Sequence, residues 1–153
     1  MNKVLLATFV AVLGFSFSAS VTSADRGTKE EAVVMVQNAV AYYKAYGKEK
    51  TIAELNSSSG QFRSKDMYVN ATGMDGMTLA HANAKLVGKN VFDLKDVDGK
   101  YIVREYINIA KSPAGKGWVS YKWANPAGGI DEKTTYVEKV DDFILGCGVF
   151  ITK

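Results

Sequence analysis

His81 is the only histidine and Cys147 the only cysteine of this 153-residue chain, so they are the first candidates for chemistry. His81 could be a metal ligand, a general base or a hydrogen-bonding group in a pocket. Zinc is not favoured, because a metal site needs several donors and there is no second histidine. Cys147 lies in an apolar, strand-like run, where a thiol is expected to be buried and unreactive. We therefore expect no enzyme activity, metal or cofactor, and for His81 a structural role stays open beside a pocket role.

The acidic run Asp96-Val97-Asp98-Gly99 can be tested against a calcium-binding loop. If Asp98 and Gly99 held the fifth and sixth positions of an EF-hand loop, Glu105 would hold the twelfth. The first position would then be Leu94, whose side chain has no ligating atom. We interpret the run as a polar turn before a helix.

Large aromatic side chains gather on one face of a predicted strand. Strand alternation places Val119, Tyr121 and Trp123 together. Such side chains fill a core or line a small-ligand pocket, and we favour the pocket. Lys133 opens the next predicted strand and lies three residues before Tyr136. Its ammonium could face a ligand carboxylate at the pocket mouth or could simply be solvated.

A long helix must come first in the fold. Apolar residues recur every three or four positions across residues 29–46, which predicts an amphipathic helix. Thr28 is suited to cap its first turn, with Glu31 as the capping-box partner, and Gly47 to end it. A short second helix is predicted over residues 48–55.

The remaining chain carries mostly strand signals. Strands are predicted over residues 66–72, 77–81, 117–123, 133–140 and 143–151, and a helix over residues 101–111. Arg104 on that helix is a surface charge or a ligand contact. The order indicates the α+β class, with one antiparallel sheet of about five strands and helices on one face.

The N-terminus predicts export. Lys3 precedes an almost wholly apolar stretch over residues 4–17, which is typical of a signal peptide, here residues 1–24 with a cut after Ala24. A membrane anchor is the alternative, but the apolar stretch is shorter than the ~20 residues that a spanning helix needs.

Charge and cysteine usage limit the classes of partner. Without residues 1–24, 18 basic and 16 acidic side chains remain, a formal charge of +2 with no basic stripe. Neither nucleic acid nor an anionic membrane is therefore an expected partner. One cysteine cannot form an intramolecular disulfide, so packing must stabilise the fold. We expect residues 25–153 to form a single periplasmic or secreted domain without membrane insertion.

Short motifs along nearly all of this expected domain match one family in order. They are Lys29-Glu30-Glu31-Ala32-Val33, Gly60-Gln61-Phe62, Leu79-Ala80-His81, Leu86-Val87-Gly88-Lys89-Asn90, Asp96-Val97-Asp98-Gly99-Lys100, Gly117-Trp118-Val119, Tyr121-Lys122-Trp123, Lys133 with Tyr136-Val137, and Gly146-Cys147-Gly148. By these motifs the chain resembles the single Cache domain, an extracytoplasmic ligand-sensing module of bacterial receptors. The resemblance implies a PAS-like fold, with a long N-terminal helix and a central antiparallel sheet that cups a small pocket.

The resemblance also implies a ligand, a short carboxylate such as acetate, propionate, pyruvate or lactate. The ligand-binding residues it indicates are His81, Tyr121, Trp123, Lys133 and Tyr136, with Tyr68 and Arg104 in second rank. A lysine or histidine would pair with the carboxylate while aromatic walls enclose the carbon chain. The stretch Tyr68-Val69-Asn70-Ala71-Thr72-Gly73 departs from the apolar strand of relatives, and we expect this to alter one pocket wall and the ligand preference.

The expected partner follows from the same resemblance. We expect no transmembrane helix or output domain in the chain, so a sensor of this kind would signal through a separate membrane receptor or histidine kinase. The alternative is a partner-binding or assembly protein whose Cache-like pocket is vestigial. A ligand-binding domain requires Lys133 and His81 to face the same cavity, whereas an interaction protein requires an exposed apolar patch.

Overall fold

The computed structural model describes residues 26–151. The predicted signal peptide, residues 1–24, lies outside these described residues. No helix within residues 26–151 is both long and apolar enough to cross a membrane.

The first helix, α1 (Lys29–Asn56), contains the two helices predicted over residues 29–46 and 48–55. The Thr28 hydroxyl accepts a hydrogen bond from the Glu31 N–H at 3.2 Å, and the Glu31 carboxylate accepts one from the Thr28 N–H at 2.9 Å. This capping box satisfies two N–H groups that have no partner inside the helix. Gly47 has φ 83°, which ends the first helical segment, and the second segment continues directly from it.

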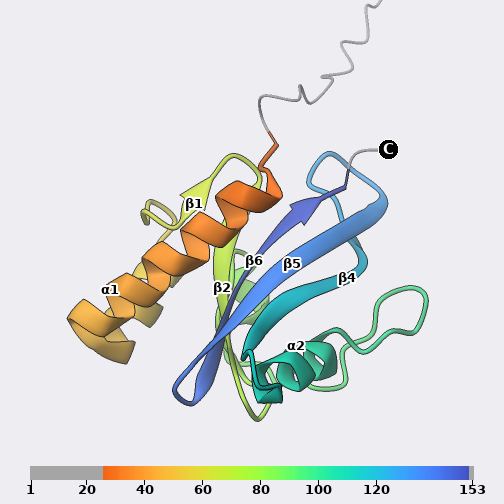
Figure 1. Ribbon diagram of the computed structural model, residues 1–153. Helices are drawn as coiled ribbons and strands as arrows, with labels where there is room; N and C mark the ends of the chain where they lie inside the picture. The colour runs from red at the N-terminus through yellow and green to blue at the C-terminus, as the bar shows by residue number, and fades with distance from the viewer. Residues whose placement is uncertain (1–25, 152–153) are drawn as a thin grey trace, which may run out of the picture.

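Six antiparallel strands form one sheet, in the order β1-β2-β6-β5-β4 with β3 paired to β2. Their bounds are β1 (Arg63–Ser64), β2 (Met67–Gly73), β3 (Thr78–Ala80), β4 (Lys116–Ala124), β5 (Ile130–Val140) and β6 (Phe143–Phe150). Short 3₁₀ helix η2 (Ala84–Leu86) and helix α2 (Ile102–Lys111) lie between β3 and β4. The expected α+β class, with a long N-terminal helix and one antiparallel sheet, is confirmed (Figure 1).

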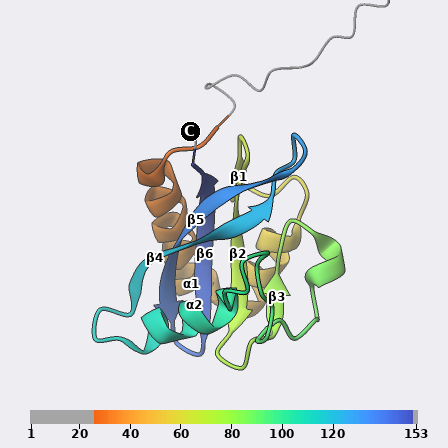
Figure 2. The ribbon, with the colours of Figure 1, turned by 90° about the vertical axis from the view of Figure 1, so that its right-hand side faces the viewer.

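The helices lie on both faces of the sheet, so the expectation that they share one face is wrong. In Figure 2, α1 lies behind the strands and α2 in front of them. Alternation along β5 gives the reason: Tyr136 packs in the core beneath α1, while its neighbour Val137 packs in the core beneath α2. Every residue of β6 is buried, as a strand covered on both faces must be.

Candidate functional site

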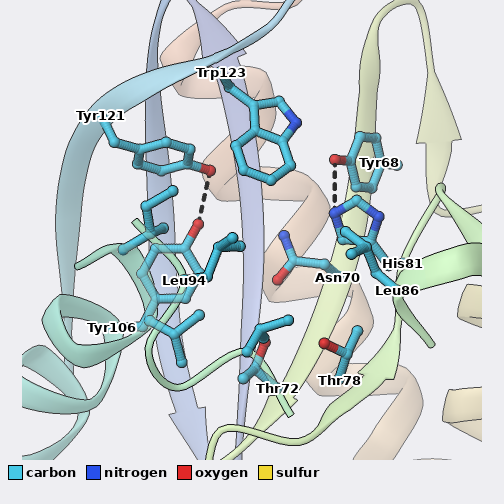
Figure 3. Close-up of a pocket in the computed structure, with 13 residues that line it drawn as sticks. Tyr68, Asn70, Thr72, Thr78, His81, Leu86, Leu94, Tyr106, Tyr121 and Trp123 are labelled. Atoms are coloured by element: carbon cyan, nitrogen blue, oxygen red, sulfur yellow. Dashed lines mark hydrogen bonds between the residues drawn. The ribbon is translucent and has the colours of Figure 1, made fainter. Parts of the chain in front are cut away.

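A small cavity of about 40 Å³ lies between the α2 face of the sheet, α2 itself and the connection between β3 and α2 (Figure 3). Its lining is Tyr68, Asn70, Thr72, Thr78, His81, Leu86, Val91, Leu94, Ile102, Val103, Tyr106, Tyr121 and Trp123. We call this the inner cavity. Residues 81–101, which we call the covering segment, supply three apolar side chains to its wall: Leu86, Val91 and Leu94.

Strand register explains how this concave face forms. Tyr121 pairs with Lys133 across β4 and β5, and Lys133 pairs with Phe150 across β5 and β6. Paired residues project to the same face, so these three side chains lie on the cavity side of the sheet. Gly148 projects no side chain there, and a Cβ at its position would lie 2.5 Å from Lys133 Cε. The glycine lets the lysine cross β6 toward β2.

His81 and Tyr68 form a hydrogen-bonded pair at one end of the inner cavity, with 3.1 Å between Nε2 and the hydroxyl oxygen. The Asn83 N–H donates to His81 Nδ1 at 2.9 Å. A nitrogen that accepts a hydrogen bond carries no proton, so the neutral ring has its proton on Nε2 and donates it to Tyr68. The Tyr68 O–H is then free to donate to a ligand.

The surroundings keep this imidazole neutral. Burial, together with the positive charges of Lys133 and Arg63, lowers the pKa of His81 to about 4. Burial also keeps the Tyr68 pKa above its ordinary value, so its hydroxyl remains a donor. The pair presents one free hydrogen-bond donor, the Tyr68 O–H, without a charge of its own.

The positive charge comes from Lys133, in a second cavity of about 270 Å³ that we call the outer cavity. Its lining is Asp66, Tyr68, His81, Ala82, Asn83, Trp123, Ala124, Pro126, Lys133 and Phe150. Tyr68, His81 and Trp123 line both cavities and form the boundary between them. Lys133 and His81 thus face the same cavity, as the sequence argument for a ligand-binding domain required.

Lys133 is only 3% exposed. Its Nζ lies 4.8 Å from the centre of the Tyr68 ring and 4.9 Å from that of Phe150, and no described carboxylate lies within ion-pair distance. Burial lowers the pKa of Lys133 to about 8, because the charged form has lost most of its hydration. A bound anion would restore the stabilisation of the charged ammonium that burial removes.

The opposite end of the inner cavity carries a chain of three hydroxyl groups. Tyr121 Oη lies 2.8 Å from Tyr106 Oη and 2.8 Å from Thr135 Oγ1. Burial raises the pKa of both tyrosines, so both stay protonated. Asn70 lies between the two ends of the cavity in Figure 3, and none of residues 26–151 hydrogen-bonds its amide.

Two of the sequence candidates lie away from both cavities. Tyr136 is on the α1 face of β5, where its hydroxyl donates to Glu138 Oε2 at 3.0 Å. Arg104 points to the outside of α2, pairs with Asp93 and stacks on the Tyr101 ring, 3.8 Å from its centre. The structure brings Tyr68, His81, Tyr121 and Trp123 to the inner cavity and Lys133 to the outer one.

The acidic turn at residues 96–99 ties the covering segment to the edge of the sheet. Asp96 Oδ2 accepts a hydrogen bond from the Lys122 N–H of edge strand β4 at 3.0 Å, and Oδ1 accepts from the Asp98 and Lys100 N–H groups. These bonds hold the pKa of Asp96 below its ordinary value. Lys122 Nζ also pairs with Asp98 at 2.9 Å. The run is a structural turn, and within residues 26–151 no cluster of three or more His, Cys, Asp or Glu side chains could hold a metal ion.

Sequence reasoning expected residues 68–73 to shape one pocket wall without singling out Asn70 and Thr72, and it missed Thr78 and Tyr106 as cavity residues. A signal for the first two was present, because Tyr68, Asn70 and Thr72 alternate along one strand and so share a face. Tyr106 lies four residues after Ile102, on the buried face of α2.

The family model for "Single Cache domain 2" matches residues 24–152 of this chain. The chain belongs to this family. Cache domains are extracytoplasmic sensor modules that bind small ligands, and the cavities described here lie on the face that the PAS-like sheet cups.

Two solved structures of sensor domains resemble this fold. A Cache chemosensory domain described for its recognition of carboxylic acids has 26% sequence identity, a TM-score of 0.69, and coverage of 80% of this chain and 92% of that one. A methyl-accepting chemotaxis protein from Vibrio parahaemolyticus has 26% identity, a TM-score of 0.68, and coverage of 80% and 88%.

A curated relative is larger than this domain. The sensor histidine kinase MctS from Rhizobium johnstonii is 35% identical over 91 residues, which are 57% of this chain and 19% of the kinase. The match thus spans about a fifth of that protein's length.

Proposed function

We propose that this Cache domain binds a short-chain carboxylate, of the size of acetate, propionate, pyruvate or lactate, where its two cavities meet. We propose further that it does so outside the cytoplasm, after export by the N-terminal signal peptide. The ligand's occupancy would then be reported to a membrane receptor or histidine kinase.

The observation that carries the proposal is the buried, unpaired ammonium of Lys133 facing the same cavity as the His81–Tyr68 pair. A buried charge without a counter-ion destabilises a fold, and an incoming anion removes that cost. Asp66 lines the same cavity, but its carboxylate accepts a hydrogen bond from the Gly27 N–H at 2.7 Å and forms no ion pair with Lys133. The site has room for an external carboxylate.

The cavities suggest how the ligand would lie. Its carboxylate would accept the Tyr68 O–H at the boundary, with Lys133 supplying the positive charge from the outer side. Its carbon chain would enter the inner cavity toward Leu94 and Ile102. Because one water needs ~10–15 Å³ of such space, about 40 Å³ suits a ligand of few non-hydrogen atoms.

Binding would act on signalling by favouring one conformation. Leu86, Val91 and Leu94 of the covering segment line the cavity, so a ligand contacts that segment only when it is closed. A ligand shifts an equilibrium by its difference in affinity for the two states. The closed segment is therefore the state that the ligand would populate.

The test is calorimetry and thermal shift of residues 25–153 with two- to four-carbon monocarboxylates, against their amides and amino acids. A specific acid should raise the unfolding midpoint by mass action. Lys133→Ala should abolish binding, whereas Lys122→Ala, which removes an exposed lysine of the same sheet, should not. Absence of binding by any acid, or unchanged affinity of Lys133→Ala, would refute the proposal and favour the partner-binding alternative.

A further inference from the structure

The hydroxyl groups of Thr135, Tyr121 and Tyr106 meet at the far end of the inner cavity. Thr135 is fully buried, and its hydroxyl oxygen lies 2.8 Å from that of Tyr121. When Thr135 donates to Tyr121, the Tyr121 O–H can donate to Tyr106. In that arrangement the O–H of Tyr106, which lines the cavity, is free to donate to a ligand.

Two tyrosine hydroxyls thus approach the inner cavity from opposite walls, Tyr68 from the β2 side and Tyr106 from the α2 side (Figure 3). Between them lies the free amide of Asn70, which offers both a donor and an acceptor. When a plain alkanoate binds with its carboxylate at the Tyr68 end, it has no further polar group to pair with Asn70 and Tyr106.

The positions of the charges decide which end takes the carboxylate. Lys133 and Arg63 both act on His81, so the potential is positive at the Tyr68 end. Tyr106 contacts the phenol of Tyr121 and packs with apolar residues of α2, and no lysine or arginine lines the inner cavity. A second ligand group at that end is therefore neutral and accepts a hydrogen bond.

Building on the proposed function, we infer that Tyr106, with Asn70, selects monocarboxylates bearing a hydroxyl or oxo oxygen on C2 over alkanoates of equal chain length. Tyr106 donates to that oxygen. Asn70 Oδ1 accepts the proton of a 2-hydroxyl group, and Asn70 Nδ2 donates to a 2-oxo group. An alkanoate would place a methylene against these groups and leave them unpaired, which is the situation in which binding sites discriminate strongly.

The test compares the pairs lactate and propionate, and glycolate and acetate, which differ only by the 2-hydroxyl group. Calorimetry on the wild-type domain should give dissociation constants about tenfold or more lower for the hydroxy acids, as expected for one satisfied hydrogen bond. Tyr106→Phe should remove this preference by weakening lactate binding about tenfold while leaving propionate binding unchanged. Tyr43→Phe is the matched control, since its hydroxyl bonds Asp141 outside the cavities.

The wild-type comparison keeps the inference testable even if Tyr106→Phe fails to fold. Equal affinity for lactate and propionate in the wild-type domain, or equal weakening of both acids by Tyr106→Phe, would overturn the selectivity and leave the carboxylate site standing. Failure of every acid to bind would overturn both.

Discussion

Lys133 lies over the ring of Tyr68, with its Nζ 4.8 Å from the ring centre. The two residues come from strands on either side of β6, so the lysine spans a whole strand to reach the tyrosine. An aromatic face stabilises a desolvated cation, though less than a carboxylate does. Charge and hydroxyl donor are thus held together before any ligand arrives.

Replacing Lys133 should lower the affinity for carboxylates and raise the stability of the fold near pH 7. Lys133→Met keeps most of the side-chain volume and removes the charge, so it should lose carboxylate affinity and yet unfold at a higher temperature near pH 7. The folded-state pKa of about 8 lies below the ordinary 10.5, so the unfolded chain binds more protons between these values. As pH increases from 8 to 10.5, the free energy of unfolding of the wild type should therefore increase relative to that of Lys133→Met, by up to about 3 kcal/mol. Urea titrations across this range measure it, and a constant difference would contradict a desolvated lysine.

His81, as the only histidine, can be followed directly by NMR. Its folded-state midpoint should lie near pH 4, against about 6.5 in urea, because burial disfavours the imidazolium. Between these values the unfolded chain binds the additional proton, so His81 lowers stability as pH falls from 6.5 to 4. His81→Gln should remove this contribution, and Lys133→Met should raise the His81 midpoint. A folded-state midpoint near 6.5 would contradict the buried, neutral ring.

Much of this fold was predictable because it depends on local signals. Thr28 with Glu31 marked the start of α1, and Gly47 marked its kink. Strand β1 was missed, since two residues are too few for a periodic pattern. Alternation correctly placed Tyr121 and Trp123 on one face of β4.

The site was less predictable, because its parts meet only in the folded sheet. The family resemblance placed Lys133 and Tyr136 in one site, but a spacing of three along a strand sends them to opposite faces. Arg104 shared a helix with Tyr106, and only packing shows which of them faces the cavity. Lys133 reaches across β6 only because Gly148 of β6 leaves room for it, and the sequence of β5 alone does not show this.

Gly148→Ala should displace the Lys133 side chain from its place over Tyr68. The added Cβ would lie 2.5 Å from both Lys133 Cε and Thr135 Oγ1, so the lysine must leave its place over Tyr68. We expect carboxylate affinity to fall at least about tenfold, as for loss of a charge-assisted contact. Gly117→Ala is the control, because its Cβ would meet only the Ile109 side chain, at 3.3 Å. If Gly148→Ala bound carboxylates as the wild type does, the placement of Lys133 would be wrong.

Asp96→Ala should loosen the covering segment without touching the cavity wall. It removes the acceptor for the N–H groups of Lys122, Asp98 and Lys100, so these amides should exchange with solvent faster. Asp98→Ala is the matched control, because it loses only a pair with the exposed Lys122 ammonium, and surface pairs contribute little. Since the closed segment brings Leu86, Val91 and Leu94 to the ligand, Asp96→Ala should also speed ligand dissociation. Faster amide exchange with an unchanged dissociation rate would show that the ligand leaves through the outer cavity, past Trp123, and that the segment does not gate the site.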